Sequence, residues 1–125
     1  MFVIGDDMTI HITRGDTALF ALTATIDNES YLFKYNDVVR FNVFAKKNCD
    51  DVVLRKDVKV NRSSSTVEIK LDGNDTSIGE VISKPTDYWY EVELNPDTNP
   101  QTIIGYDDDG AKIFKLYPEG GGINE

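Results

Sequence analysis

The sequence predicts an all-β protein, an immunoglobulin-like β-sandwich of about seven to nine short, mostly antiparallel strands. Three observations predict this fold. Val, Ile, Thr, Tyr and Phe dominate the residue choice, short segments alternate apolar and polar residues, and clusters of Asn, Asp and Gly separate these segments. No long segment has the Ala-rich or Leu-rich character of a helix.

Length and charge limit the classes of protein to which the chain can belong. With 125 residues it is long enough for one domain, which we expect over residues 1–119, followed by a flexible Gly-rich tail at 120–125. The formal net charge of −9 disfavours nucleic acid as a partner. The single cysteine, Cys49, rules out an internal disulfide. We see neither a signal peptide nor an apolar segment of membrane-spanning length.

Alternation predicts the strands of the first half of the chain. The strand predicted over residues 38–45 is typical. Its inward residues are Val39, Phe41, Val43 and Ala45, and Arg40 and Asn42 face outward. Residues 72–87 break the pattern, and we expect a turn and a short helical turn there, before Pro85. Strands are expected in residues 8–13, 17–26, 38–45 and 67–71, and one or two more in residues 52–60.

The second half is expected to contain three more strands. Residues 88–94 place Tyr88, Tyr90, Val92 and Leu94 inward and Trp89 outward. Asp109-Gly110 is typical of a two-residue hairpin turn, so residues 101–107 are predicted to pair with residues 111–117. In this register Phe114 lies opposite Gly105 in the core, with Ile103 and Leu116 on the same face, and Ile113 lies opposite Tyr106 on the outer face.

The tripeptide Arg14-Gly15-Asp16 has two interpretations. It could be an adhesion motif exposed at a loop tip, or a glycine bend whose aspartate begins the next strand. Because three-residue matches are frequent by chance and no secretion signal precedes it, we interpret it as a bend.

Motifs for catalysis and cofactor binding are missing from the sequence. His11 is the only histidine and has no nucleophile motif beside it, and no glycine-rich phosphate loop precedes a helix. We therefore expect a protein that is not an enzyme and needs no cofactor. Asp107, Asp108 and Asp109 are weak candidates for a calcium site, because a strand would direct the first two carboxylates to opposite faces.

Outward-facing apolar residues are the best candidates for a binding surface. Aromatic and aliphatic side chains on the outside of a sheet are typical of protein contacts or of platforms for sugars. The alternative is that a loop, such as residues 83–87 or residues 1–4, covers them. The candidate partner-binding residues are Trp89, Ile104, Tyr106, Ile113 and Tyr117.

Three segments together resemble the small β-sandwich domains of tailed-phage and prophage structural proteins. These are "ITRGDTALFALTATI", "YNDVVRFNVFA" and "YWYEVELNPDTNPQTIIGYDDDGAKIFKLYPEG". The chain is similar to the N-terminal domain of the baseplate upper protein family over roughly residues 8–117. The resemblance rests on Gly15-Asp16 before an apolar strand, on the Tyr-x-Tyr-x-Val-x-Leu strand from Tyr88 to Leu94, and on Thr102-Ile103.

The resemblance implies a structural protein of the baseplate, tail or neck that assembles with other phage proteins. Because the sequence ends soon after the expected domain, we do not expect it to contain the receptor-binding and trimerising parts of a full baseplate protein. Its expected location is the virion, or the bacterial cytoplasm before assembly, with no nucleic-acid or membrane partner and with self-association left open. The alternative function is a carbohydrate-binding module that uses Trp89 and Tyr106.

Overall fold

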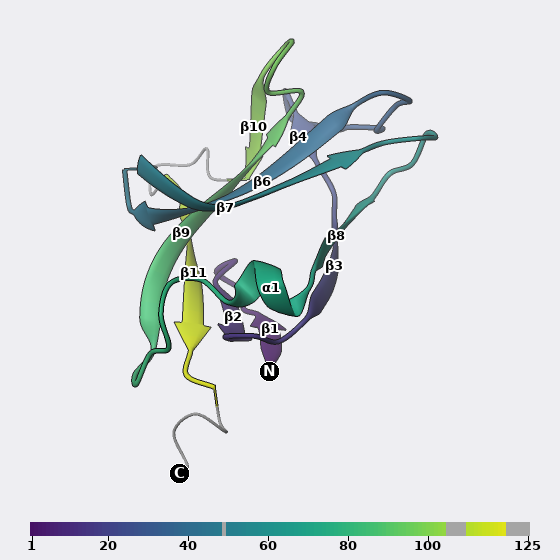
Figure 1. Cartoon of the computed structure of the whole chain (residues 1–125). Coiled ribbons are helices and arrows are strands. Elements are labelled where there is room, and N and C mark those ends of the chain that lie inside the picture. Colours follow the sequence, from purple (N-terminus) through teal and green to yellow (C-terminus); the bar gives the residue numbers. More distant parts are fainter. Residues whose placement is uncertain (49, 105–109, 120–125) are drawn as a thin grey trace.

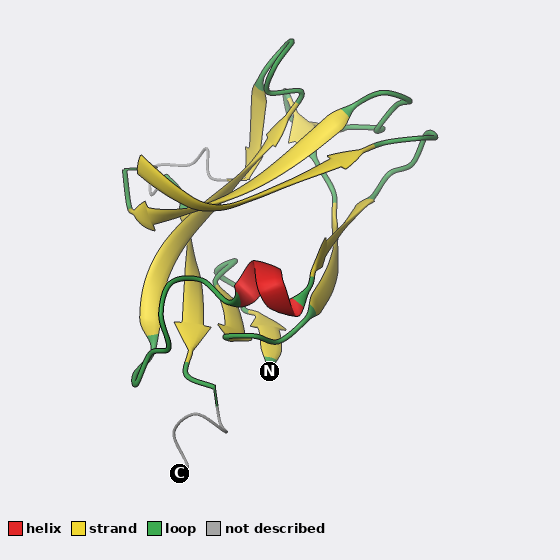
Figure 2. Cartoon of the chain, viewed as in Figure 1, coloured by secondary structure: helices red, strands yellow, loops and turns green. Residues whose placement is uncertain are grey.

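Strands make up most of the structure, a computed structural model that describes residues 1–48, 50–104 and 110–119. These residues form eleven strands and one short helix, α1 (Gly73–Thr76). Figure 2 shows the strands in yellow and the helix in red. The all-β prediction is therefore confirmed. There are more strands than predicted because β1 (Phe2–Ile4), β4 (Thr25–Ile26) and β5 (Glu29–Ser30) have only two or three residues each. None of the described helical residues forms a segment long and apolar enough to cross a membrane.

Seven of the strands form one large sheet. Its order is β1-β2-β11-β9-β6-β7, and β10 also pairs with β9. All neighbours are antiparallel except β2 and β11, which run parallel. The bounds are β1 (Phe2–Ile4), β2 (Ile10–Thr13), β6 (Val38–Lys46), β7 (Asp50–Lys59), β9 (Thr86–Leu94), β10 (Gln101–Ile104) and β11 (Lys112–Tyr117).

Two smaller strand pairs complete the fold. The antiparallel pair of β3 (Ala18–Leu22) and β8 (Val67–Leu71) lies opposite β9 and β11, with α1 between them (Figure 1). The strand predicted over residues 17–26 is divided, since β4 (Thr25–Ile26) leaves β3 and pairs with β5 (Glu29–Ser30). Asp27 and Asn28 join that pair with φ of 53° and 67°, as a tight hairpin turn requires.

The core lies between the large sheet and the β3–β8 pair, on the faces that alternation predicts. Val39, Phe41 and Val43 are each 0% exposed, as expected for the inward positions of β6. The Phe41 ring lies 5.7 Å from Phe20 of β3 and 5.4 Å from Tyr90 of β9. The contact with Phe20 joins the large sheet to the β3–β8 pair, and the contact with Tyr90 lies within the large sheet.

The predicted hairpin of residues 101–117 is wrong. Both β10 and β11 pair with β9 on the same side, β10 along residues 92–94 and β11 along residues 86–90. The strands therefore follow one another along β9 instead of pairing with each other. Phe114 is in the core as predicted, but its neighbours are Ile10 and Tyr88. Gly105, the predicted partner of Phe114, lies outside the described residues. So does Tyr106, the predicted partner of Ile113.

The connection after β8 forms the predicted short helical turn. Asp72 caps α1: its carboxylate accepts a hydrogen bond of 2.9 Å from the Asp75 N–H, and the Asp75 carboxylate accepts one of 2.9 Å from the Asp72 N–H. Lys56 of β7 then donates to Asp75 at 2.8 Å. The helix is thus joined to the edge of the large sheet.

A buried carboxylate closes one end of the core. Asp37 is 6% exposed and accepts hydrogen bonds from the Tyr31 hydroxyl at 2.7 Å, the Lys34 N–H at 2.9 Å and the Asn95 amide at 3.1 Å. Burial opposes ionisation, but these donors outweigh it and hold the pKa of Asp37 below its usual value. Burial and the same carboxylate raise the pKa of Tyr31 to about 12.

Candidate functional site

The outer face of the large sheet carries a row of apolar side chains across four strands. Val52 of β7 lies opposite Phe44 of β6, and Phe44 lies opposite Trp89 of β9. Trp89 in turn lies opposite Ile113 of β11. We call these four residues the outer row. None of them belongs to the hydrophobic core cluster, which the other face of these strands contributes.

A bulge in β7 completes the outer row. Val43 pairs with Leu54, but the next residue, Phe44, pairs with Val52, so Val53 has no partner on β6. Because β7 contains this additional residue, the apolar side chain of Val52 lies opposite Phe44 after the register shift. Directly opposite aromatic and β-branched residues attract each other across strands.

The outer row becomes more exposed toward its ends. Phe44 is 4% exposed although it points away from the core, and Trp89 beside it is half-buried. Ile113 is 37% and Val52 43% exposed. Solvent therefore reaches the row at both ends, and the aromatic pair at its centre is packed within the surface.

A shallow cleft of about 240 Å³ adjoins Trp89 and Ile113. Its polar side chains come from residues far apart in the sequence. The Asp7 carboxylate accepts a hydrogen bond of 3.0 Å from the Thr9 N–H, and this bond lowers the pKa of Asp7 and favours its charged form. The remaining lining residues are Lys47, Ala111 and Lys112. The cleft therefore combines an indole, a carboxylate and two ammonium groups.

Polar residues border the row along β6, β7 and β9. Asn42 was predicted to face outward, and it is only 3% exposed. Its side-chain oxygen accepts a hydrogen bond of 3.0 Å from Arg55 Nε, and its amide donates to Glu93 at 3.5 Å. Asn42 therefore bonds to long side chains of the two neighbouring strands, and these cover its amide.

Of the predicted binding residues, the structure brings Trp89 and Ile113 together and removes Ile104 from the surface. Ile104 is 8% exposed and part of the core cluster, as is Ile103 at 4%. The pairing of β10 with β9 shifts register between Thr102 and Ile104. This irregularity breaks the alternation, so two consecutive residues face inward.

Tyr117 lies apart from the outer row. It is half-buried at the end of β11, opposite Thr13 of β2, and its hydroxyl lies 2.9 Å from His11 Nδ1. The aromatic ring and the imidazole centroids are 5.9 Å apart. The single histidine therefore has a local partner in the sheet.

Several predictions concern residues that the structure does not describe. Tyr106, the weak calcium candidates Asp107, Asp108 and Asp109, and the predicted tail at 120–125 all lie outside the described residues. Within residues 1–48, 50–104 and 110–119, no group of three or more His, Cys, Asp or Glu residues is arranged to hold a metal ion.

The Arg14-Gly15-Asp16 segment is a bend, as predicted. The Asp16 N–H donates to the Thr13 carbonyl at 3.0 Å, and Gly15 has a φ of 88°, which favours glycine. The Arg14 side chain points toward the protein and donates to the carbonyl oxygens of Ile78 at 3.1 Å and Gly79 at 2.7 Å. The Asp16 carboxylate pairs with the amino terminus. Both charged groups of the tripeptide are thus used internally.

Sequence reasoning missed Phe44 and Val52 as members of the surface. A signal for Phe44 was present, because it occupies the same outward phase of the strand as Arg40 and Asn42. Val52 had no comparable signal, since its position depends on the bulge in β7.

Comparisons with known proteins returned no relative of this chain. No family model matches it, and neither the curated proteins nor the solved structures contain a match.

Proposed function

We propose that this protein is a non-enzymatic structural component of a tailed-phage or prophage particle, in the baseplate, tail or neck, and that it binds other particle proteins through the outer row. The observation that supports the binding part is the row itself. It places an aromatic pair and two exposed aliphatic residues on the solvent side of a sheet, which is typical of protein contacts. The phage setting rests on the resemblance of the sequence alone.

An immunoglobulin-like sandwich is the finer fold class that we propose. The strand order β11-β9-β6-β7 in the large sheet matches the order of the strands named G, F, C and C′ in immunoglobulin-like domains. The separate pair of β3 and β8 corresponds to strands B and E. The acidic net charge of −9 supports the solubility of such a protein before assembly.

The first experiment is mass spectrometry of particles released when prophages of the source organism are induced. We expect the chain at a fixed copy number, and that number would distinguish the baseplate, tail and neck. Its absence from particles that contain the other tail proteins would refute the particle role.

A pair of variants then tests the outer row. We expect Ile113→Lys to prevent incorporation into particles, because it places a charge at the exposed end of the row. Leu19→Lys is the matched control, since Leu19 is 60% exposed on β3 in the other sheet. Equal incorporation of both variants would contradict binding through the outer row.

The cleft beside Trp89 favours carbohydrate binding as a second candidate function. Sugar sites combine an apolar wall with a few polar groups that fix orientation, and Asp7, Lys47 and Lys112 are placed to do this. A glycan array is the test. We expect hits that disappear in Trp89→Ala, and an array without hits would refute this alternative.

A further inference from the structure

The edges of β7 and β8 are open on the same side of the molecule. β7 ends the large sheet and pairs only with β6, and β8 pairs only with β3, among the described strands. The two strands are joined by residues 60–66 and diverge from that connection, as Figure 1 shows. An open edge carries backbone N–H and C=O groups that can pair with another chain.

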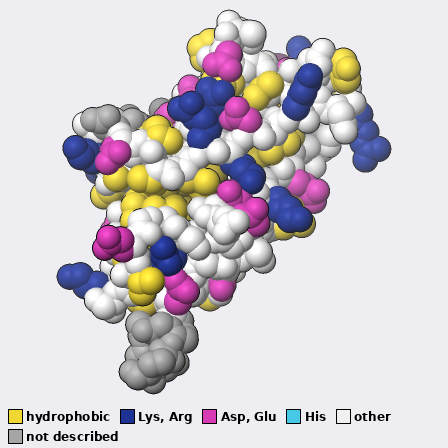
Figure 3. Space-filling view, in the orientation of Figure 1, with side chains coloured by type: hydrophobic (Ala, Val, Ile, Leu, Met, Phe, Trp, Pro, Cys, Tyr) yellow, Lys and Arg dark blue, Asp and Glu magenta, His cyan; other side chains and the backbone are white. Residues whose placement is uncertain are grey.

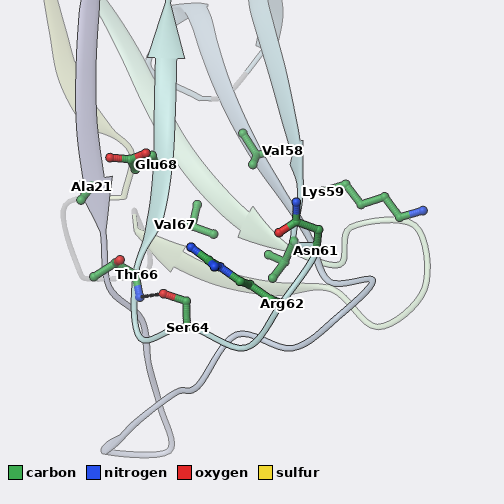
Figure 4. A pocket seen from close by; sticks show the side chains of 10 residues that line it. Ala21, Val58, Lys59, Asn61, Arg62, Ser64, Thr66, Val67 and Glu68 are labelled. Carbon is green, nitrogen blue, oxygen red and sulfur yellow. Dashed lines mark hydrogen bonds between the residues drawn. The ribbon is translucent and has the colours of Figure 1, made fainter.

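A cleft of about 450 Å³ lies where the two strands diverge. Its apolar lining includes Val58, Val60 and Val67, of which Val60 and Val67 are 5% and 6% exposed. Figure 4 shows side chains from both strands around it, with Thr66 and Glu68 on one side and Val58 and Asn61 on the other. The cleft thus has apolar side chains in its lining next to the edge of β8.

The charged side chains that line this cleft are Lys59, Arg62 and Glu68, so the sum of their charges is positive although the protein is acidic overall. Lys59 and Arg62 both line it and are exposed, and neither side chain takes part in an ion pair of the described residues. Arg62 lies across the cleft in Figure 4. In Figure 3, Lys and Arg side chains project at the end of the molecule where β7 leads into β8. In a chain of net charge −9, a local pair of cations attracts acidic groups.

We propose that this cleft binds an extended acidic segment of a partner protein, which adds as a third strand to the open edge of β8. The backbone of the segment pairs with β8, its apolar side chains contact Val58, Val60 and Val67, and its carboxylates lie near Lys59 and Arg62. Addition also suits the local structure, because a sheet of two strands gains stability from a third. The site is separate from the outer row, so it does not depend on the function proposed above.

The test uses an eight-residue probe peptide in which Val and Glu alternate, added to the full-length protein. We expect amide chemical shifts to change at residues 58–68, and the amides of β8 to exchange more slowly with solvent. Arg62→Glu should weaken binding about tenfold by reversing one of the two charges. Lys84→Glu, which makes the same change of charge in the connection before β9, should leave binding unchanged.

Two isomeric probes distinguish strand addition from simple charge attraction. Each is N-methylated at alternate residues, so that only one of its two edges can donate hydrogen bonds. Because one edge of the added strand faces β8, we expect one isomer to bind and the other to fail. Equal binding of the isomers, equal weakening by both charge reversals, shifts confined to the surroundings of Trp89, or no binding at about millimolar peptide would each overturn the proposal.

Discussion

The two faces of the large sheet use the same types of residue for different purposes. On β9 the inward residues Tyr90 and Val92 are 2% and 0% exposed, whereas Trp89 on the outward face is half-buried. On the inner face, the β3–β8 pair packs against these apolar side chains. On the outer face, Trp89 lies between its cross-strand neighbours Phe44 and Ile113 in the same sheet. Hence we expect substitutions on the inner face to change the free energy of unfolding and those on the outer face to change mainly binding.

The strongest test of this contrast is Phe41→Ala on the inner face. Phe41 is 0% exposed and its ring lies near those of Phe20, Tyr90 and Phe114. We expect the free energy of unfolding to fall by about 3–5 kcal/mol, because the truncation leaves a cavity among rigid rings. Urea unfolding followed by fluorescence measures the change. A decrease in the free energy of unfolding of less than about 1 kcal/mol would mean that Phe41 does not hold the large sheet and the β3–β8 pair together.

At the end of the core, Asp37→Asn tests a buried polar group with many partners. We expect a loss of about 2 kcal/mol near neutral pH, because the amide keeps the shape but not the charge that three donors surround. The contribution of Asp37 is present above the unfolded-state pKa of about 4 and is lost as pH falls through the lower folded-state pKa.

The pH dependence supplies the control for this prediction. Asp57 and Asp75 also have lowered pKa values, so the wild type loses stability in acid for several reasons. The difference between wild type and Asp37→Asn isolates one carboxylate, and it should shrink below about pH 4. A difference that stays constant down to pH 2 would show that the charge of Asp37 does not stabilise the fold.

An intermediate effect is expected for Trp89→Ala on the outer face. Removing the indole uncovers Phe44, which is 4% exposed, so some stability depends on the outer row. We expect a loss of about 1–2 kcal/mol, clearly smaller than for Phe41→Ala, since solvent already reaches the half-buried indole. The same urea titration compares the two. Equal decreases in the free energy of unfolding for Trp89→Ala and Phe41→Ala would contradict the distinction between the outer and inner faces.

The smallest change in stability is expected for Ile113→Lys, at the exposed end of the row. The side chain is 37% exposed, and a lysine can extend its ammonium group into water. The free energy of unfolding should change by no more than about 0.5 kcal/mol, although binding is lost. A thermal melt beside the incorporation assay checks both. A large drop in stability would mean that the loss of binding reports misfolding.

Local patterns in the sequence were sufficient for much of the fold. The strands of residues 38–45 and 88–94 and the bend at Gly15 were predicted correctly. Their predicted inward residues are in the core or packed against it, except Ala45, which is half-buried and outside the core cluster. The reason is that side chains alternate with a period of two in any strand, whatever its partner. Similarly, the short helical turn was expected from the break in alternation between β8 and β9.

Pairing between strands could not be predicted in this way. Asp109-Gly110 favoured a local hairpin, yet β9 pairs with both β10 and β11 and leaves them end to end. The irregularity after Thr102 turned Ile104 inward, and the bulge in β7 brought Val52 beside Phe44. Each of these depends on which edge a strand meets, and hydrogen bonds to residues far along the chain decide that.

The sequence by itself therefore determined the class of structure and the buried side of the regular strands at residues 38–45 and 88–94, because both follow from local periodicity. Only the tertiary structure decided that Phe44, Trp89 and Ile113 form one surface, and that the open edges of β7 and β8 border one cleft. These groupings join residues that are far apart in sequence. They arise from strand order, which is fixed when the whole core packs.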